Sequence, residues 1–298
     1  LMGIRQIRHR AQERHYTGNQ QNSALTDELI ERFAGLVPRD LSGCRVLELG
    51  PGPGSITRHL HGNSCRITAL ELDPQAIEIV TEFCEQVHPC NLNDPEWPAL
   101  LGDAQKFSVI VAADVLEHLY DPWSTLQKML PLLAKDGYVV ISLPHVAHNA
   151  VVACLLNEDF EYQPWGLLDR THIRFWGIHN IQKLFDDAGF KIVEADFVVR
   201  SPEQTEFANR WRKLPGQARK ALEWNRFGNV YQVVLKAVPL AADGRALQLE
   251  SLAVPAPGAG GFSAGARRNR LLGFFISFLS LDTRARISRF LQRLGIRH

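Results

Sequence analysis

The amino-acid sequence predicts an α/β fold, with a doubly wound and mostly parallel sheet followed by a helical C-terminal extension. Three observations lead to this prediction. Short apolar runs alternate with helical patterns over residues 25–240, a glycine-rich loop follows the first of those runs, and the alternation stops near residue 241. A chain of 298 residues is longer than most single domains, so one α/β domain with an appendage is expected.

The elements can be placed in order along the chain. A first helix is predicted over residues 26–37, where apolar residues recur at helical spacing and Thr26 is suited to cap the N-terminus. Six strands and four further helices follow, and the last two strands are expected to form a hairpin at the sheet edge. The predicted strands are 45–49, 66–71, 108–112, 138–143, 191–199 and 230–238, and the predicted helices are 55–60, 74–84, 122–133 and 178–188.

Four regions differ in composition. Residues 1–24 form a basic segment that is expected to act as a lid, and residues 25–240 form the α/β domain. Residues 241–266 are rich in Ala, Gly and Pro, which predicts a flexible linker, and residues 267–298 are predicted to form an amphipathic basic helix.

Charge is unevenly distributed between these regions. From Arg245 onward there are nine arginines against Glu250 and Asp282, a net charge of +7, so residues 1–244 carry −6 of the total of +1. This asymmetry indicates an anionic partner for the C-terminal region. No apolar signal-peptide segment and no CxxC pair is present, so a cytoplasmic protein with neither a disulfide framework nor a zinc site is expected.

The glycine loop lies directly after the first predicted strand, in "VLELGPGPGSITR". Its glycines follow a GxGxG spacing, whereas a dinucleotide fingerprint requires GxGxxG and a P-loop requires GK[ST]. Pro51 and Pro53 also remove two backbone N–H donors that a pyrophosphate would need. The pattern therefore argues against both kinds of phosphate site. A simple tight turn is the alternative.

An acid follows one strand later. Glu71 ends the second predicted strand, 17 residues after Gly54, where a carboxylate can accept hydrogen bonds from ribose hydroxyls. An acidic ribose site without a phosphate cradle suits a nucleoside that carries a short zwitterionic chain, which describes S-adenosylmethionine. A solvated strand end is the alternative for Glu71.

Four motifs together resemble those of the class I S-adenosylmethionine-dependent methyltransferases, over roughly residues 25–238: "VLELGPGPG", "ALELDP", "PCNLND" and "VIVAADVLEHLYDP". The resemblance implies a seven-stranded Rossmann-like sheet and S-adenosyl-L-methionine as cofactor. Asn91 departs from the family, which more often has Asp there, and a plain turn residue is its alternative. The implied cofactor-binding residues are Glu48, Gly50, Gly52, Gly54, Glu71, Leu72, Asn91, Leu92, Ala113 and Asp114.

A second set, "LPHVAHN", "GLLDRTHIRFW" and "LFDDAGF", is similar to methyltransferases of bacterial surface-glycan and cell-envelope gene clusters. The "LEH" after the fourth strand motif also resembles the ubiquinone-biosynthesis O-methyltransferases. These resemblances imply methylation of a hydroxyl on a glycan or lipid-linked intermediate, as in polysaccharide biosynthesis. The alternatives are a small-molecule methyltransferase of quinone or natural-product metabolism and a non-catalytic, membrane-tethered scaffold that binds the cofactor.

Histidines gather where the predicted strands end. His148 is predicted to be the general base that takes a proton from the acceptor, with His145 and His172 as further candidates. The predicted substrate-binding residues are Glu117, His118, Asp169 and Arg174. The alternatives are structural roles: Glu117 and His118 would only form hydrogen bonds that hold the loop after the fourth strand motif, and Arg174 would only anchor its own turn. No metal is expected, because the spacing of acids and histidines fits no known ligand pattern.

The C-terminal region combines arginines with apolar residues. Its longest apolar stretch, 271–281, is too short for the roughly 20 residues that span a bilayer. In the predicted helix, apolar residues at 287, 290, 291 and 294 lie opposite arginines at 286, 289 and 293. This predicts an interfacial helix on an anionic membrane surface, on the inner face. Docking on the domain or in an oligomer is the alternative, and no nucleic-acid partner is expected because no RNA-binding module is present.

Overall fold

A computed structural model describes residues 20–37, 41–102 and 105–257 of the chain, with side chains from Asp27 onward. Its sheet has seven strands in the order β3-β2-β1-β4-β5-β7-β6. Neighbours among β1 to β5 pair in parallel, and β7 runs antiparallel to both β5 and β6. The strands are β1 Arg45–Leu49, β2 Arg66–Glu71, β3 Gln86–Pro89, β4 Phe107–Ala113, β5 Leu133–Pro144, β6 Phe190–Val199 and β7 Val230–Pro239. The predicted doubly wound, mostly parallel sheet is confirmed.

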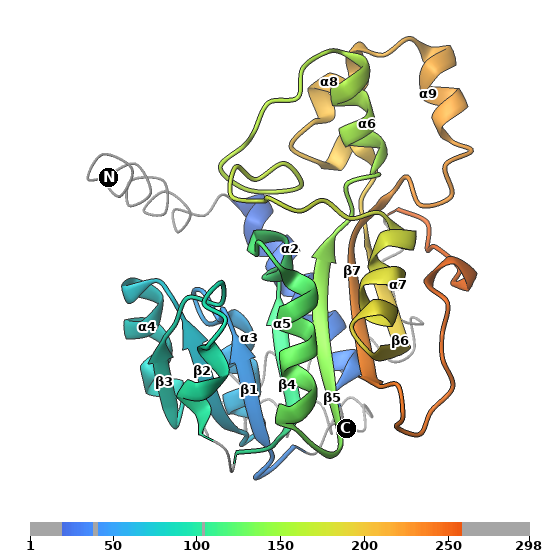
Figure 1. Ribbon diagram of the computed structural model, residues 1–298. Helices are drawn as coiled ribbons and strands as arrows, with labels where there is room; N and C mark the ends of the chain where they lie inside the picture. Colours follow the sequence, from blue (N-terminus) through green and yellow to red (C-terminus); the bar gives the residue numbers. More distant parts are fainter. Residues whose placement is uncertain (1–19, 38–40, 103–104, 258–298) are drawn as a thin grey trace, which may run out of the picture. The chain divides into compact units, whose positions relative to one another are not determined.

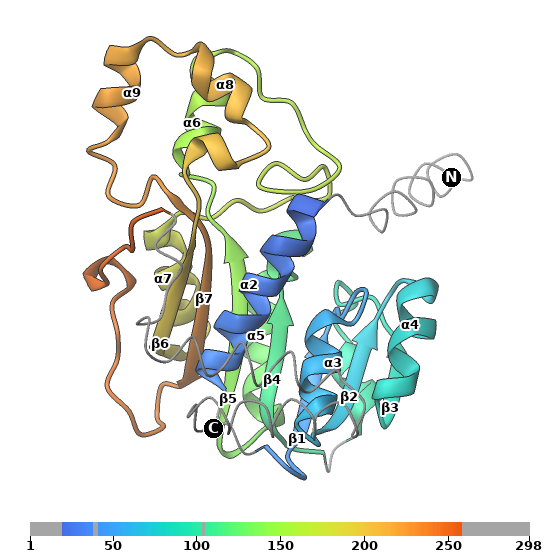
Figure 2. The ribbon, with the colours of Figure 1, turned by 180° about the vertical axis from the view of Figure 1, so that it is seen from behind.

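Helices cover both faces of the sheet (Figures 1 and 2). Successive residues of β1 point to opposite faces: Val46 is buried in the cluster that includes α2 and α3, and Leu47 in the cluster that includes α5 and α7. Both faces are therefore apolar, which explains why the strands read as continuous apolar runs. The helices are α2 Gln20–Leu36, α3 Ser55–Gly62, α4 Pro74–Val80, α5 Pro122–Met129, α6 Asn149–Leu156, α7 Ile178–Asp187, α8 Ala208–Lys213 and α9 Gly216–Leu222.

The strand order reverses between β1 and β4, which are neighbours in the sheet. In such sheets ligands bind outside the carboxyl ends of the strands at this switch point. The glycine loop follows β1, and the segment from Asp114 to His118 follows β4, so two of the resembling motifs meet here. The helices α6, α8 and α9 lie beyond the carboxyl ends of the central strands (Figure 1).

Three features of the domain differ from the sequence-based expectation. Thr26 is not an N-cap, because α2 begins at Gln20 and contains it. The short strand β3 was not predicted, because its four residues, QVHP, form no apolar run and none of them is fully buried. The helices α6, α8 and α9 were also not predicted.

The start of the predicted linker was placed too early. Leu249 is fully buried in the sheet's core cluster, and its N–H donates to Gln182 Oε1 at 3.1 Å. Arg226 donates to the carbonyls of Glu250 and Leu252. The compact unit extends to Val254, and Pro255 begins the second unit. Residues 241–254 therefore belong to the folded domain rather than to a flexible linker.

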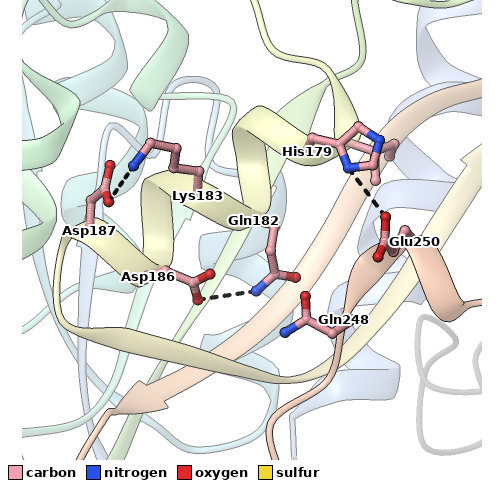
Figure 3. Close-up of a pocket in the computed structure, with 8 residues that line it drawn as sticks. His179, Gln182, Lys183, Asp186, Asp187, Gln248 and Glu250 are labelled. Carbon is pink, nitrogen blue, oxygen red and sulfur yellow. Dashed lines mark hydrogen bonds and ion pairs between the residues drawn. The ribbon is translucent and has the colours of Figure 1, made fainter.

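Figure 3 shows a surface pocket of about 340 Å³ between α7 and residues 248–250. It is lined mostly by polar side chains, and His179 Nδ1 lies 3.4 Å from Glu250 Oε2 across it. None of the residues that the sequence predicted for cofactor or substrate lines it.

Most of the predicted lid (residues 1–19), the rest of the linker (258–266) and the basic helix (267–298) lie outside the described residues. Within the described ranges, no helix has the length and apolarity that a membrane crossing requires.

Candidate active site

The glycine loop follows β1 in a conformation that favours glycine. Gly50, Gly52 and Gly54 have φ angles of +60°, +52° and +76°. A Cβ at Gly50 would lie 2.9 Å from Val115 Cγ2, so the loop packs directly on the segment after β4. A Cβ at Gly52 would have no neighbour within 4 Å. The backbone at Gly52 thus faces open space, where a ligand can lie on it.

The Glu71 carboxylate holds this loop. Its Oε2 accepts a hydrogen bond from Gly52 N at 2.9 Å, and its Oε1 accepts from Leu72 N at 2.6 Å and Asp73 N at 2.8 Å. A carboxylate has about four lone-pair positions, and the three amides occupy three of them, so one remains for a ribose hydroxyl. A hydrogen bond to a second ribose hydroxyl would require one of the three amide hydrogen bonds to break. The structure thus puts Glu71 beside the loop, and its ribose contact remains a prediction.

Glu48 lies on β1, just before the loop, and is almost fully buried. Burial raises the pKa of Glu48 to about 7, and the nearby Glu71 carboxylate adds to the rise. Its Oε2 has no hydrogen-bond partner among the described residues. Glu48 is therefore a polar group held beneath the loop without full hydrogen bonding.

The remaining predicted cofactor residues surround the same edge. Leu72 is 58% exposed directly after Glu71, and Leu92 packs against the core. Asn91 is exposed and its Oδ1 accepts from Asn93 N at 3.0 Å, which closes a turn; this favours its alternative as a turn residue. Ala113 is partly buried at the end of β4.

Asp114 joins the ends of three strands. Its φ is +53°, which is uncommon for a residue other than glycine and is often found at functional sites. Its Oδ1 accepts from Ser142 Oγ at 2.6 Å and its Oδ2 from Gln232 Nε2 at 2.8 Å. Burial raises the pKa of Asp114, and these two hydrogen bonds oppose the rise. Sequence reasoning missed Ser142 and Gln232, although both lie near the carboxyl edge.

Glu117, His118 and His172 form a cluster at the same edge. Glu117 is fully buried, and its Oε1 lies 3.8 Å from His172 Nε2. The rings of His118 and His172 meet edge to face, with centroids 4.8 Å apart. Burial raises the pKa of Glu117 well above its ordinary value, and the Asp114 and Asp169 carboxylates add to the rise. The structure therefore brings together three residues predicted for this site.

Backbone bonds hold the cluster. The carbonyl of Glu117 accepts from Ile173 N at 2.9 Å and from Arg174 N at 3.0 Å, so the loop before α7 is fixed on the turn after β4. Asp169 closes that loop, because its Oδ1 accepts from both Thr171 N and Thr171 Oγ1.

Arg174 is held by its neighbours. It donates to the carbonyl of Tyr120, and its guanidinium lies 5.8 Å from the centre of the Trp123 ring. These contacts favour its role as an anchor, and a contact with substrate remains a prediction.

The structure argues against the prediction that His148 is the general base. His148 caps α6: its Nδ1 accepts from Ala150 N at 3.1 Å, and its Nε2 donates to the Arg200 carbonyl at 2.9 Å. Both ring nitrogens are occupied and the side chain is fully buried. Burial lowers the pKa of His148 to about 4, which makes it a poor base near neutral pH.

His145 is equally unsuited. It is 1% exposed, its Nδ1 donates to the Val230 carbonyl at 3.1 Å, and burial lowers its pKa to about 4. Both histidines stabilise the joint between β5, α6 and β7. Of the three candidates only His172 lies in the polar cluster.

The family match supports the geometric assignment. A model of the methyltransferase domain family matches residues 16–195, more than half of the chain. The chain belongs to this family. S-adenosylmethionine is therefore the cofactor that the glycine loop and Glu71 are expected to hold.

Curated relatives share shorter stretches. The chain is similar to the ribosomal RNA small subunit methyltransferase A of Erythrobacter litoralis, with 38% identity over 86 residues, 29% of this chain and 28% of that protein. It is similar to the ubiquinone biosynthesis O-methyltransferase of Glaesserella parasuis, with 25% identity over 126 residues, 40% of this chain and 53% of that protein. The chain thus spans about a quarter and about half of the length of these two relatives.

A solved structure confirms the fold. The magnesium protoporphyrin IX methyltransferase of Synechocystis PCC 6803, solved with bound SAH, aligns with a TM-score of 0.51 at 14% identity. The alignment covers 77% of this chain and 93% of that one.

Proposed function

We propose that this protein transfers the methyl group of S-adenosylmethionine to a hydroxyl oxygen of a glycan or lipid-linked intermediate. The observation that carries the proposal is an exposed aromatic group, one member of which lies in the same loop as His172 of the polar cluster. Phe160 contacts both Tyr162 and Phe175, with ring centroids 5.7 and 6.4 Å apart, and all three are exposed. Phe175 follows His172 by three residues in the loop that is bonded to Glu117.

This combination suits an acceptor with two kinds of surface. The exposed rings offer apolar area to the face of a sugar ring or to a lipid chain. The polar cluster offers acceptors and donors to a hydroxyl. In methyl transfer the cofactor supplies the leaving group, so the protein's main task is to position the acceptor oxygen in line with the methyl carbon.

A phenolic hydroxyl of a quinone precursor is the second candidate, favoured by the relatives named as ubiquinone biosynthesis O-methyltransferases. RNA is disfavoured although other relatives are named for ribosomal RNA. Residues 1–244, which contain the candidate site, carry a net charge of −6, RNA binding relies on positive charge, and the positive charge from Arg245 onward is assigned below to a membrane surface. A scaffold that binds the cofactor without turnover is the third candidate.

One screen separates these candidates. The full chain is incubated with S-adenosylmethionine and, in parallel, with lipid-linked glycans, phenolic quinone precursors, small-subunit ribosomal RNA or no acceptor, and the release of S-adenosylhomocysteine is measured. The proposal expects release with the first class. Release with the phenols alone or the RNA alone would replace it, and cofactor binding without any release would favour the scaffold.

We also propose that residues 267–298 hold the enzyme on the cytoplasmic face of an anionic membrane. The support is compositional: eight arginines accompany a single acid, Asp282. Each arginine near such a surface contributes about 1 kcal/mol, and the apolar residues between them add burial. A lipid-linked acceptor would then be concentrated beside the site.

A further inference from the structure

The Glu117 carboxylate is buried and accepts no hydrogen bond from the part of the chain that the structure describes. Its side chain is fully inaccessible, and among the described residues neither Oε1 nor Oε2 has a hydrogen-bond partner. Leaving a buried polar group unsatisfied costs about 1–3 kcal/mol, and more for a charged one. Such a group is expected to have a partner in the working protein, and the groups facing it indicate which kind.

Two imidazoles face this carboxylate. His172 Nε2 lies 3.8 Å from Glu117 Oε1. Glu117, His118 and His172 each present one potential metal-ligand atom, and these three atoms lie within 4.8 Å of one another. His172 is 54 residues from His118 in the chain, so the three residues form no recognisable ligand motif in the sequence. The bonds from Ile173 and Arg174 to the Glu117 carbonyl bring it into place.

The orientation of His118 is also fixed. Its Nδ1 lies 3.2 Å from the Thr171 carbonyl, which can only accept, so Nδ1 carries the hydrogen and Nε2 carries a lone pair. Metal-bound histidines typically donate their other ring N–H to such a carbonyl, which sets the tautomer and the ring orientation.

We propose that Glu117, His118 and His172 bind a divalent transition-metal ion. Two imidazoles and one carboxylate form a ligand set typical of catalytic zinc and of non-haem iron, with positions left open for water or substrate. Bonds of 2.0–2.2 Å place tetrahedral ligand atoms about 3.4 Å apart, so the three groups need only a small contraction around the ion. This proposal departs from the sequence-based expectation that no metal is bound.

The ion would act on the acceptor, and this part rests on the proposed methyl transfer. The cluster follows β4 directly after Val115, which packs on Gly50 of the cofactor loop. Bound there, the ion would lower the pKa of an acceptor hydroxyl, whose proton would pass to water. The acceptor oxygen would then form its bond to the methyl carbon as the C–S bond breaks, and the electron pair of that bond would stay on sulfur as a neutral thioether.

The test uses the full chain and needs no acceptor. Metal-free protein is titrated with Zn²⁺ by calorimetry, with Mg²⁺ for comparison. One Zn²⁺ per chain is expected to bind, far more tightly than Mg²⁺. Glu117→Gln and His172→Ala should each weaken Zn²⁺ binding by more than about 100-fold, because changes outside the ligand shell alone cost 10–100-fold. The control His179→Ala removes an exposed histidine and should bind Zn²⁺ as the parent does.

Thermal unfolding keeps the test decisive. Zn²⁺ should raise the melting temperature of the parent and of His179→Ala but not of Glu117→Gln. Without metal, Glu117→Gln should melt no lower than the parent, because it replaces an unpartnered buried acid. Absence of one-site Zn²⁺ binding in the parent, or equal binding by Glu117→Gln, would overturn the proposal. Cofactor binding is measured separately in metal-free protein, so failure of one inference is not mistaken for failure of the other.

Discussion

The backbone N–H of Gly52 donates a 2.9 Å hydrogen bond to Glu71 Oε2, which joins the loop after β1 to the end of β2. Glu71 therefore has two tasks in this account. It holds the glycine loop in shape, and it offers its remaining lone pair to the ribose of the cofactor.

Glu71→Ala is expected to weaken S-adenosylmethionine binding by about 10- to 100-fold, since a hydrogen bond to a charged group contributes about 1.5–3 kcal/mol. Calorimetry measures the change. The control Glu85→Ala removes an exposed acid that pairs with Arg66 at the opposite edge of the sheet, and it should leave affinity unchanged. Equal affinity in parent and Glu71→Ala would remove the acid from the cofactor site.

Gly52→Val is expected to abolish measurable cofactor binding. A Cβ is strained at a φ of +52°, at a cost of about 1–2 kcal/mol, and the isopropyl group would fill the space in which the ligand lies. Gly43→Val is the matched control, because Gly43 has a φ of +73°, is exposed, has open space around its Cβ position and lies before β1 rather than after it. If the Gly52→Val protein folds normally and still binds S-adenosylmethionine, the cofactor does not bind on the open side of the loop.

His148 is expected to act in stability rather than in proton transfer. His148→Ala should lower the free energy of unfolding by about 2–4 kcal/mol, because the α6 cap is lost and the Arg200 carbonyl loses its donor. Asn can also cap a helix, so His148→Asn should recover part of this loss. Urea unfolding measures both. A changed pH–rate profile in a well-folded His148→Asn protein would restore the role of general base.

Glu48 gives a dependence of stability on pH. Its pKa is about 7 in the folded protein and near 4.5 when unfolded, so the folded state holds the proton more tightly. Its contribution is complete below pH 4.5 and is lost as the pH rises to 7, a change of about 3 kcal/mol. Glu48→Gln cannot ionise, so its unfolding free energy relative to the parent should rise between pH 4.5 and 7. A difference that is constant across this window would show that Glu48 is not buried in its neutral form.

The C-terminal region is tested by liposome flotation. The full chain should float with anionic vesicles at low salt and less at high salt, because arginine–lipid attraction is screened. A chain ending at Ala266 should not float. If both float equally, or neither does, the tail serves docking or oligomerisation, and truncation should then change the apparent mass or the stability.

Six of the seven strands and the glycine loop could be predicted, because apolar runs buried on both faces and closely spaced glycines after a strand leave strong local signals. The Glu117–His118–His172 group could be predicted only in part. Each residue follows a strand or precedes a helix, but their contact depends on two backbone bonds to the Glu117 carbonyl that no pattern encodes.

For His148, in contrast, the sequence predicted a catalytic role that the structure does not support. His148 lies at the carboxyl edge, as a base should. However, the Arg200 carbonyl, directly after β6, occupies its Nε2, and Tyr231 of β7 packs against its ring, and both residues are distant from it in sequence. Burial of that kind results from tertiary packing. The helices α6, α8 and α9 were not predicted either. The sequence of α6, NAVVACLL, is almost wholly apolar, so it lacks the alternation of apolar and polar faces that marks an amphipathic helix.

The central claim is that the loop after β1 binds S-adenosylmethionine rather than a dinucleotide. Equilibrium dialysis of the full chain with radiolabelled S-adenosylmethionine, competed by S-adenosylhomocysteine or NAD, tests it most directly. The account predicts saturable binding to one site per chain, displaced by S-adenosylhomocysteine and unaffected by NAD. Absence of saturable binding, or displacement by NAD as effective as that by S-adenosylhomocysteine, would contradict it.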